Sequence, residues 1–362
     1  MRYRLVALSP HGGGGASMGH VRSTSIPRLG RLSAVGLIAA TVGLLPGGVA
    51  AAGTAAAAST TGGGFRAPAY AGDFPDPTVL VVGGTYWAYA TGSAGRNLQV
   101  TSSTDLQHWT APVDPLPVLP PWAARGSTWA PSVVRAGATY VMWYTVRDAA
   151  AGRQCISVAS SSTPQGPFTD RSSQPAICQL ADGGSIDPNV YTTSTGQLDL
   201  IWKSDDNAVG LPTHLWGQPL AAGGLSLTGS PSRLLTQSAP WQSPSVEGPS
   251  IVAHRGTYYL FYGANSFASP ASGIGYATSV SLLGPYADRS TSGPWLASRG
   301  NATGPQGPAV FTDASGVVRL AFAAWYGTVG YPQGMRAMWT APLGFTRAGV
   351  PTLGCARETV FS

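Results

Sequence analysis

Five segments of the sequence repeat one pattern, and this repeat restricts the possible folds more than any other feature. Each segment has a short apolar run after an X-Pro pair, then a turn, then a strand rich in aromatic residues. The prolines are separated by 54, 57, 61 and 59 residues. They are Pro77, Pro131, Pro188, Pro249 and Pro308. A two-stranded unit with room for two more strands, repeated at this period, is typical of a propeller blade. We therefore predict an all-β fold, a five-bladed β-propeller.

Composition agrees with an all-β chain. Only 10% of the 362 residues are charged, whereas the chain contains 48 glycines and 30 prolines. This mixture favours short strands and tight turns over amphipathic helices. A tandem β-sandwich is the structural alternative, but sandwiches do not normally repeat a proline-anchored first strand at this spacing.

Residues 28–53 have the order of a secretory signal peptide. Arg28 and Arg31 precede an apolar run, Ala34–Leu45, which Pro46 and two glycines end. This run is shorter than the roughly 20 residues of a membrane-spanning helix. We therefore expect a secreted, extracellular protein without a membrane anchor, rather than a retained one.

The signal suggests a division of the chain into three parts. We expect residues 1–52 to be the signal-peptide region, with an over-extended start, because Met18 would begin a more ordinary signal. Residues 53–68 are expected to be a linker, and residues 69–362 the propeller.

The positive charge of the sequence lies mostly in the first part. Residues 1–60 hold five arginines and no acid, so the formal charge of the remainder is +6 − 5 = +1. Lys203 is the only lysine, and there is no basic run. Because phosphate-backbone binding needs clustered cations, we predict no nucleic-acid partner.

The three cysteines allow one disulfide. Cys155 and Cys178 are close enough in sequence to bridge adjacent strands in an oxidising compartment, which leaves Cys355 over. Three reduced, buried thiols are the alternative. No spacing of cysteine and histidine suggests zinc, and we predict no metal site.

The residues before the repeated prolines should lie around one mouth of the channel, because the innermost strand of each blade lines it. These residues are Asp76, Ala130, Asp187, Gly248 and Gly307, with Glu247 directly before Gly248. Three blades would thus bring a carboxylate to one small volume. An Asp-Pro pair can also simply form a turn, but this does not explain acids at equivalent places in three of five repeats.

Three neighbouring carboxylates favour acid–base chemistry. They cannot all be ionised without a large cost in free energy, so their pKa values separate, and one becomes an acid while another becomes a base. Hydrolysis of a glycosidic bond needs this pair. The third carboxyl can hold the acid in place and raise its pKa.

Five ordered motifs resemble glycoside hydrolase family 43, five-bladed propeller enzymes that cleave polysaccharides containing arabinose and xylose. The resemblance extends from about Ala69 to the C-terminus. The motifs are "FPDPTVL" (74–80), "SSTDLQHWT" (102–110), "STWAPSVV" (127–134), "SIDPNVY" (185–191) and "SVEGPSIV" (245–252).

The resemblance implies a role for each acid. Asp76 would be the general base that activates a water molecule, Glu247 the general acid, and Asp187 the residue that tunes and orients this acid, in a reaction that inverts the anomeric configuration. Asp73 competes with Asp76 for the base. We interpret Asp73 as a turn residue, because only Asp76 has the repeat-equivalent place.

Two further residues are candidates for substrate binding. Trp129 faces the same mouth by register, and its ring suits the apolar side of a pentose; a core tryptophan is the alternative. Arg336 resembles the family's late channel arginine, which hydrogen-bonds substrate hydroxyls and lies against the acid. A surface arginine is the alternative.

Two positions depart from the family pattern. Many relatives have a histidine in the fifth blade, where it coordinates a channel cation or water, but this chain has Gln306. We therefore predict no cofactor, and a tightly bound calcium in the channel is doubtful. Ser250 replaces a second frequent histidine, which favours an arabinofuranosidase-like enzyme over a β-xylosidase.

Together these features predict a secreted, monomeric glycoside hydrolase whose partner is an oligo- or polysaccharide. We expect an inverting α-L-arabinofuranosidase or exo-arabinanase. A β-xylosidase or xylanase of the same family is the near alternative. A propeller that only binds carbohydrate is the alternative from another class, but such a protein has no need of three intact carboxylates.

Overall fold

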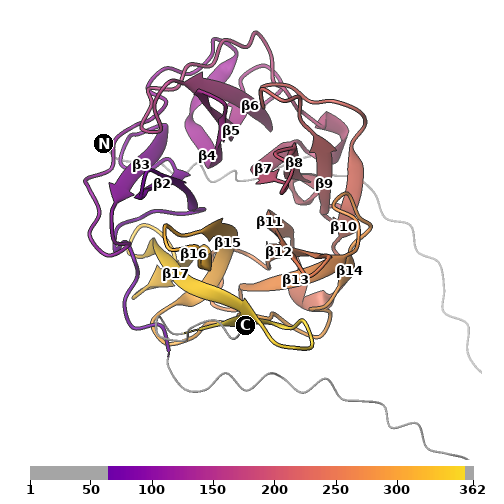
Figure 1. Ribbon diagram of the computed structural model, residues 1–362. Helices are drawn as coiled ribbons and strands as arrows, with labels where there is room; N and C mark the ends of the chain where they lie inside the picture. The colour runs from indigo at the N-terminus through magenta and orange to yellow at the C-terminus, as the bar shows by residue number, and fades with distance from the viewer. Residues whose placement is uncertain (1–63, 355–362) are drawn as a thin grey trace, which may run out of the picture. The chain divides into compact units, whose positions relative to one another are not determined.

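Five antiparallel sheets follow one another around a central axis in the computed structural model, which describes residues 64–354 (Figure 1). Each sheet is one blade, and the first strand of each blade lies nearest the axis. This arrangement confirms the predicted five-bladed β-propeller. The predictions for residues 1–63 and for Cys355 lie outside the described residues.

The blades use consecutive strands of the sequence, and short 3-10 helices lie between some of them. The first blade has β1 (Thr78–Val82), β2 (Thr85–Thr91) and β3 (Leu98–Ser103); the second has β4 (Ala123–Ala136), β5 (Thr139–Asp148) and β6 (Arg153–Ser161). The third has β7 (Ser185–Thr192), β8 (Leu198–Ser204), β9 (His214–Pro219) and β10 (Ser232–Thr236). The fourth has β11 (Val246–His254), β12 (Thr257–Ala264), β13 (Gly273–Ser279) and β14 (Ala287–Asp288). The fifth has β15 (Thr303–Thr312), β16 (Val318–Tyr326), β17 (Met335–Phe345) and β18 (Pro351–Leu353). The 3-10 helices are η1 (Leu180–Asp182), η2 (Asp206–Val209) and η3 (Pro240–Gln242).

The first two blades contain three strands instead of the four expected from the repeat. Isolated bridges replace the outermost strand, Val100 with Val113 in the first blade, and Ser160 with Thr169 and Ile156 with Ile177 in the second. None of the helices in residues 64–354 is long and apolar enough to cross a membrane.

The residue before each repeated proline has the same backbone conformation in all five blades. Its φ angle is left-handed, between 43° and 57°. In four blades the pairing of the first two strands shifts register at this point, which marks a bulge. These residues are Asp76, Ala130, Asp187, Gly248 and Gly307. The equivalence expected from the repeat is therefore present in the backbone itself.

Hydroxyl groups just after the repeated prolines connect neighbouring blades. Each one bonds to the backbone of the next blade along the chain. The contacts are Thr78 Oγ1 to Pro131 O at 2.7 Å, Val190 N to Ser132 Oγ at 3.0 Å and Val310 N to Ser250 Oγ at 3.0 Å. Ser250 thus serves the packing of two blades, and it does not line the cavity described below.

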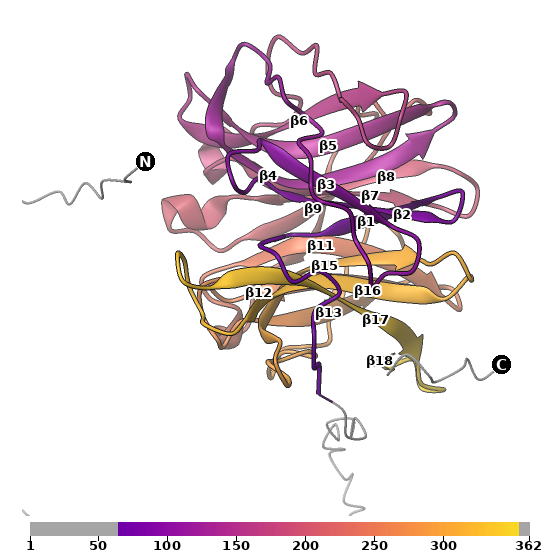
Figure 2. The ribbon, with the colours of Figure 1, turned by 90° about the vertical axis from the view of Figure 1, so that its left-hand side faces the viewer.

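The first described segment closes the ring against the last blade. Tyr70 pairs with Met338 of β17, and Phe74 N donates to Arg336 O at 2.8 Å. Figure 2 shows this segment running alongside the fifth blade. Phe65 also packs on that blade, against Phe322 and Trp339. The closure brings the start of the first blade next to Arg336.

The predicted disulfide is present. Cys155 of β6 is bonded to Cys178, which lies in the segment after this blade rather than in an adjacent strand. Next to it, Ile156 and Ile177 form a single antiparallel bridge. The disulfide therefore ties the outer edge of the second blade to the chain that leads into the third.

The close approach of the fifth blade to the first predicts the effect of one substitution. Gly307 has a φ of 57°, and a Cβ added there would lie 3.1 Å from the Cα of Asp76. Gly307→Ala should lower the free energy of unfolding by about 1–2 kcal/mol, because an L side chain is strained in this conformation and because Asp76 must move. Urea unfolding under non-reducing conditions measures this. The control Gly223→Ala, where nothing lies within 4 Å, should have almost no effect; equal losses in both variants would contradict the prediction.

Candidate active site

A cavity of about 470 Å³ lies at the mouth where the three acidic blades meet. It is lined by Asp76, Asp187, Glu247, Trp129 and Arg336, which are all five residues predicted from the sequence. A narrow space of about 30 Å³ along the channel is lined by the same three acids and by four of the five repeated prolines. The fold therefore brings together residues that lie up to 260 positions apart in the chain.

Asp76 is held by two partners from different blades. Thr91 Oγ1, at the end of β2, donates to Asp76 Oδ2 at 2.6 Å, and Arg336 Nη1 of β17 forms an ion pair with Asp76 Oδ1 at 3.2 Å. Arg336 is 9% exposed, which rules out a surface arginine. The resemblance implies that this arginine lies against the acid Glu247; both residues line the cavity, and the ion pair of Arg336 is with Asp76. This pair forms because the ring closes between β17 and the first blade.

Asp73 does more than form a turn. Its Oδ1 accepts hydrogen bonds from the hydroxyl of Tyr331 at 2.7 Å and from Arg336 N at 3.1 Å, and its Oδ2 accepts one from Ser93 at 3.0 Å. Asp73 and Tyr331 both line the cavity. This acid therefore fixes the loop before β17 and the backbone that carries Arg336.

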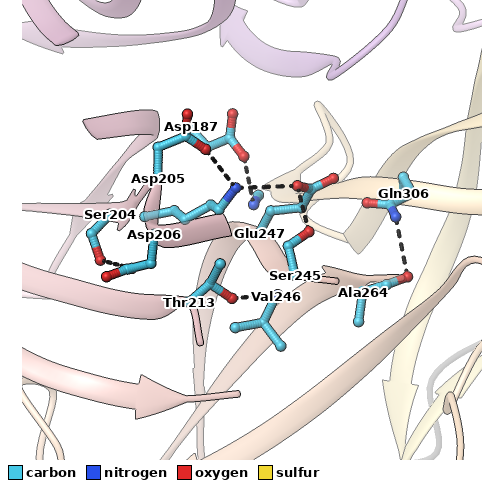
Figure 3. Close-up of polar contacts among 12 residues, drawn as sticks. Asp187, Ser204, Asp205, Asp206, Thr213, Ser245, Val246, Glu247, Ala264 and Gln306 are labelled. Carbon is cyan, nitrogen blue, oxygen red and sulfur yellow. Dashed lines mark hydrogen bonds and ion pairs between the residues drawn. The ribbon is translucent and has the colours of Figure 1, made fainter. Parts of the chain in front are cut away.

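Asp187 holds its proton far more tightly than an ordinary aspartate. Burial is the main cause that raises the pKa of Asp187 from 3.8 to about 8, and the charge of Glu247 is the second cause. The charge of Lys203 acts in the opposite direction. Gly248 N, at the left-handed position of the next blade, donates to Asp187 Oδ2 at 3.0 Å (Figure 3). Asp187 therefore keeps a proton at neutral pH, so the Asp187–Glu247 pair has a proton to give.

Glu247 is bound through one of its two oxygens. Ser245 Oγ donates to Glu247 Oε2 at 2.9 Å, and Lys203 Nζ lies 3.5 Å from the same oxygen (Figure 3). Lys203 Nζ also lies 3.1 Å from Asp205 Oδ1. Burial by itself favours the neutral amine, but Glu247, Asp205 and Asp187 together raise the pKa of Lys203, so this buried side chain carries a positive charge.

Sequence reasoning missed Lys203 and Asp205 as parts of the site. A signal was present, because the only lysine of the chain follows the apolar run Leu200–Trp202, and two aspartates stand just beyond Ser204, in "KSDD" (203–206). A charge in such a strand has to be paired when it is buried. The position of Glu247 on the next blade could not be read from that local pattern.

Aromatic side chains form part of the cavity wall. Trp129, Phe267 and Tyr331 line it, and the Arg336 guanidinium lies over the Phe267 ring at 4.9 Å from the ring centre. Trp129 is partly exposed in the cavity rather than a core residue. Aromatic faces and a few convergent polar groups are typical of small-molecule sites, and they suit the apolar face of a sugar ring.

Gln306, the fifth-blade residue at which the sequence departs from the family pattern, is buried and held by its amide nitrogen. Its amide nitrogen donates to the carbonyls of Ala264 at 3.1 Å and Asn265 at 3.2 Å. Within residues 64–354 no three His, Cys, Asp or Glu side chains are grouped to hold a metal ion. One neutral amide oxygen is a poor start for calcium, which takes six to eight oxygen ligands.

Comparison with known proteins identifies the type of site. Residues 65–349 match the family model of the glycosyl hydrolases family 43. Among curated proteins, the chain is 27% identical to the beta-D-galactofuranosidase xynD of Aspergillus niger over 60% of its length, and 24% identical to the extracellular endo-alpha-(1->5)-L-arabinanase 1 of Bacillus subtilis over 59%. The matched parts cover 64% and 68% of these two relatives.

Solved structures agree in fold. A thermostable family-43 glycoside hydrolase superposes with a TM-score of 0.70 at 25% identity, covering 80% of this chain and 95% of that one. An endo-1,4-beta-xylanase from Bacteroides thetaiotaomicron superposes with a TM-score of 0.66 at 24% identity, covering 81% and 97%. The latter likeness supports the propeller fold alone.

The raised pKa of Asp187 predicts how stability depends on pH. Between pH 3.8 and about 8 the folded protein holds a proton that the unfolded chain releases, so stability falls as pH rises through this window. Asp187→Asn removes this dependence. As the pH rises through this window, the free energy of unfolding of the variant should increase relative to that of the wild type by up to about 1.4 kcal/mol per pH unit. Urea unfolding at pH 5, 6, 7 and 8 measures the gain; parallel curves for the two proteins would contradict it.

Proposed function

Because this chain belongs to the glycosyl hydrolases of family 43, and is thus a glycoside hydrolase, we propose that it releases L-arabinofuranosyl units from plant arabinan or arabinoxylan. The observation that carries the proposal is the convergence of Asp76, Asp187 and Glu247 on one cavity. The names of the two relatives, an arabinanase and a galactofuranosidase, both refer to five-membered sugar rings and support a furanoside substrate.

The proposed reaction is a single displacement. Glu247 gives its proton to the departing glycosidic oxygen as the bond from the anomeric carbon to this oxygen breaks. On the opposite face of the sugar, a water molecule forms the new bond to the anomeric carbon and gives a proton to Asp76. This inverts the anomeric configuration. The reaction needs carboxyl groups and water but no cofactor.

Asp187 provides the proton that Glu247 passes to the substrate. Two neighbouring carboxyls share their protons, so the proton that Asp187 holds in the free protein is available to Glu247 when a substrate oxygen approaches. The backbone N–H of Gly248 keeps Asp187 in place during this exchange. Arg336 and Thr91 orient the carboxylate of Asp76 toward the water.

The site favours removal of single units, from chain ends or branches. Tyr331, held by Asp73, and Phe267 form walls at the cavity, and Trp129 offers a face for one pentose ring. The cavity is built from a single chain, so we propose a monomer. Secretion agrees with the disulfide between Cys155 and Cys178 and with the extracellular arabinanase among the relatives.

The first test is turnover of aryl glycosides by the mature chain. We expect hydrolysis of phenyl α-L-arabinofuranoside, and a loss of roughly 10²- to 10⁴-fold in kcat for Glu247→Gln, because a general acid contributes about this much. The loss should shrink for a dinitrophenyl glycoside, whose leaving group needs no proton. Release of dye measures both rates.

Each other outcome has a definite meaning. Faster turnover of the aryl β-D-xyloside or β-D-galactofuranoside would replace arabinose as the substrate. Full activity of Glu247→Gln would remove this residue as the acid. If no glycoside and no debranched arabinan is hydrolysed, the protein only binds carbohydrate.

The second test is the configuration of the first product. Hydrolysis of an α-L-arabinofuranoside should first give β-L-arabinofuranose, because the water attacks from the face opposite the leaving group. Proton NMR during the first minutes distinguishes the anomers before they equilibrate. The α-anomer as first product would contradict the role of Asp76 as a base, since retention needs a carboxylate that attacks the sugar itself.

A further inference from the structure

We propose that Lys203 is a positioning residue for the acid Glu247. Its ammonium group fixes one oxygen of Glu247 and stabilises the carboxylate that forms when the proton leaves. This inference rests on the proposed function, because it deepens the role of Glu247 as general acid.

The location of Lys203 is unusual for a lysine. It is the only one in 362 residues, and it lies 1% exposed in β8, a strand whose seven residues are all buried. Burying an ammonium group is unfavourable unless the group is well paired. A chain that otherwise uses arginine for its cations places its one lysine against the reactive acids.

The charged groups around Lys203 come from three elements. Asp205 lies directly after β8, with Oδ1 at 3.1 Å; Glu247 lies on β11, with Oε2 at 3.5 Å. Asp187 on β7 also acts on the charge of Lys203. Asp76, the fourth acid of the cavity, is instead paired with Arg336. One ammonium group thus serves three carboxyls, two of which are proposed to exchange the catalytic proton.

The contacts of Glu247 distinguish its two oxygens. Both Ser245 and Lys203 engage Oε2, whereas no hydrogen bond or ion pair within residues 64–354 engages Oε1. Oε1 is therefore the oxygen that can carry the proton toward the substrate. Lys203 and Ser245 together determine the direction in which it points.

Asp205, which pairs with Lys203, is itself held in place by hydrogen bonds of the turn after β8. Asp205 N donates to Gly184 O at 2.9 Å, and the following Asp206 accepts hydrogen bonds from Ser204 Oγ and from the backbone of His214. The turn after β8 is thereby tied to the strands of the third blade. Asp205 can hold the ammonium group in one place while Glu247 changes its protonation.

A test uses Lys203→Met and Lys203→Arg with two aryl arabinofuranosides. Lys203→Met should lower kcat by roughly 10- to 100-fold for the phenyl glycoside but much less for the dinitrophenyl glycoside, because only the former needs a proton. Lys203→Arg keeps the charge and should recover much of the loss. Equal losses on both substrates would overturn the proposal, since this is what a merely structural defect causes.

The pH profile provides a second readout. A cation lowers the pKa of a nearby carboxyl, so its removal should move the basic limb of kcat/KM to higher pH by about 1–3 units. Arg233→Met, which removes an exposed cation from β10 of the same blade, should leave the profile unchanged. An unmoved limb in Lys203→Met would also overturn the proposal.

A third measurement does not depend on activity. With 13C-labelled carboxyl groups, the NMR resonance that disappears in Glu247→Gln can be titrated without substrate. It should titrate at higher pH in Lys203→Met than in the wild type; an unchanged titration contradicts the role of Lys203. If the wild type hydrolyses no glycoside, the proposed function fails while this titration still tests the lysine. Should Lys203→Met not fold, the double variant with Asp205→Asn removes both charges and should show a smaller shift in the same direction, because Lys203 lies closer to Glu247 and the loss of the Asp205 charge acts the opposite way.

Discussion

The left-handed backbone before each repeated proline is the constraint on which the site depends. Asp76 and Asp187 take up this conformation at a cost of about 1–2 kcal/mol each, whereas glycine adopts it freely in the last two blades. In the fourth blade the acid stands one residue earlier, as Glu247. The N–H of Gly248 binds Asp187, while the equivalent N–H of Ala130 binds Thr91. One repeated conformation thus holds three carboxyls in three different environments.

The distribution of cations separates the roles of these carboxyls. Arg336 pairs with Asp76, and Lys203 lies between Glu247 and Asp205. Asp187 is instead held by a backbone N–H, and burial next to Glu247 leaves it protonated at neutral pH. A chain with so few charges therefore gives the base a permanent ion pair and gives the acid a neighbour that can return its proton.

The sequence predicts the parts of this arrangement that depend on periodicity. The spacing of the prolines predicts five blades, and the residues before them identify Asp76, Asp187 and the place of Glu247. Contacts between blades depend on how the ring closes, and no local pattern reports this. The pairing of Arg336 with Asp76 is not predicted for this reason, since the two residues lie 260 positions apart. Asp73 was taken for a turn residue because its partner Tyr331 belongs to the last blade.

The proposed acid and base lie at different interfaces between blades. Glu247 and Lys203 connect the third and fourth blades, which follow one another in the chain. Asp76 and Arg336 connect the first and last blades, where the segment around Phe74 pairs with β17. Asp73 strengthens the interface between the first and last blades, because it binds both the backbone of Arg336 and the Tyr331 hydroxyl. Chain ends open more readily than the middle of a fold. Local opening at the closure would therefore separate Asp76 from Arg336 while the acid pair stays assembled.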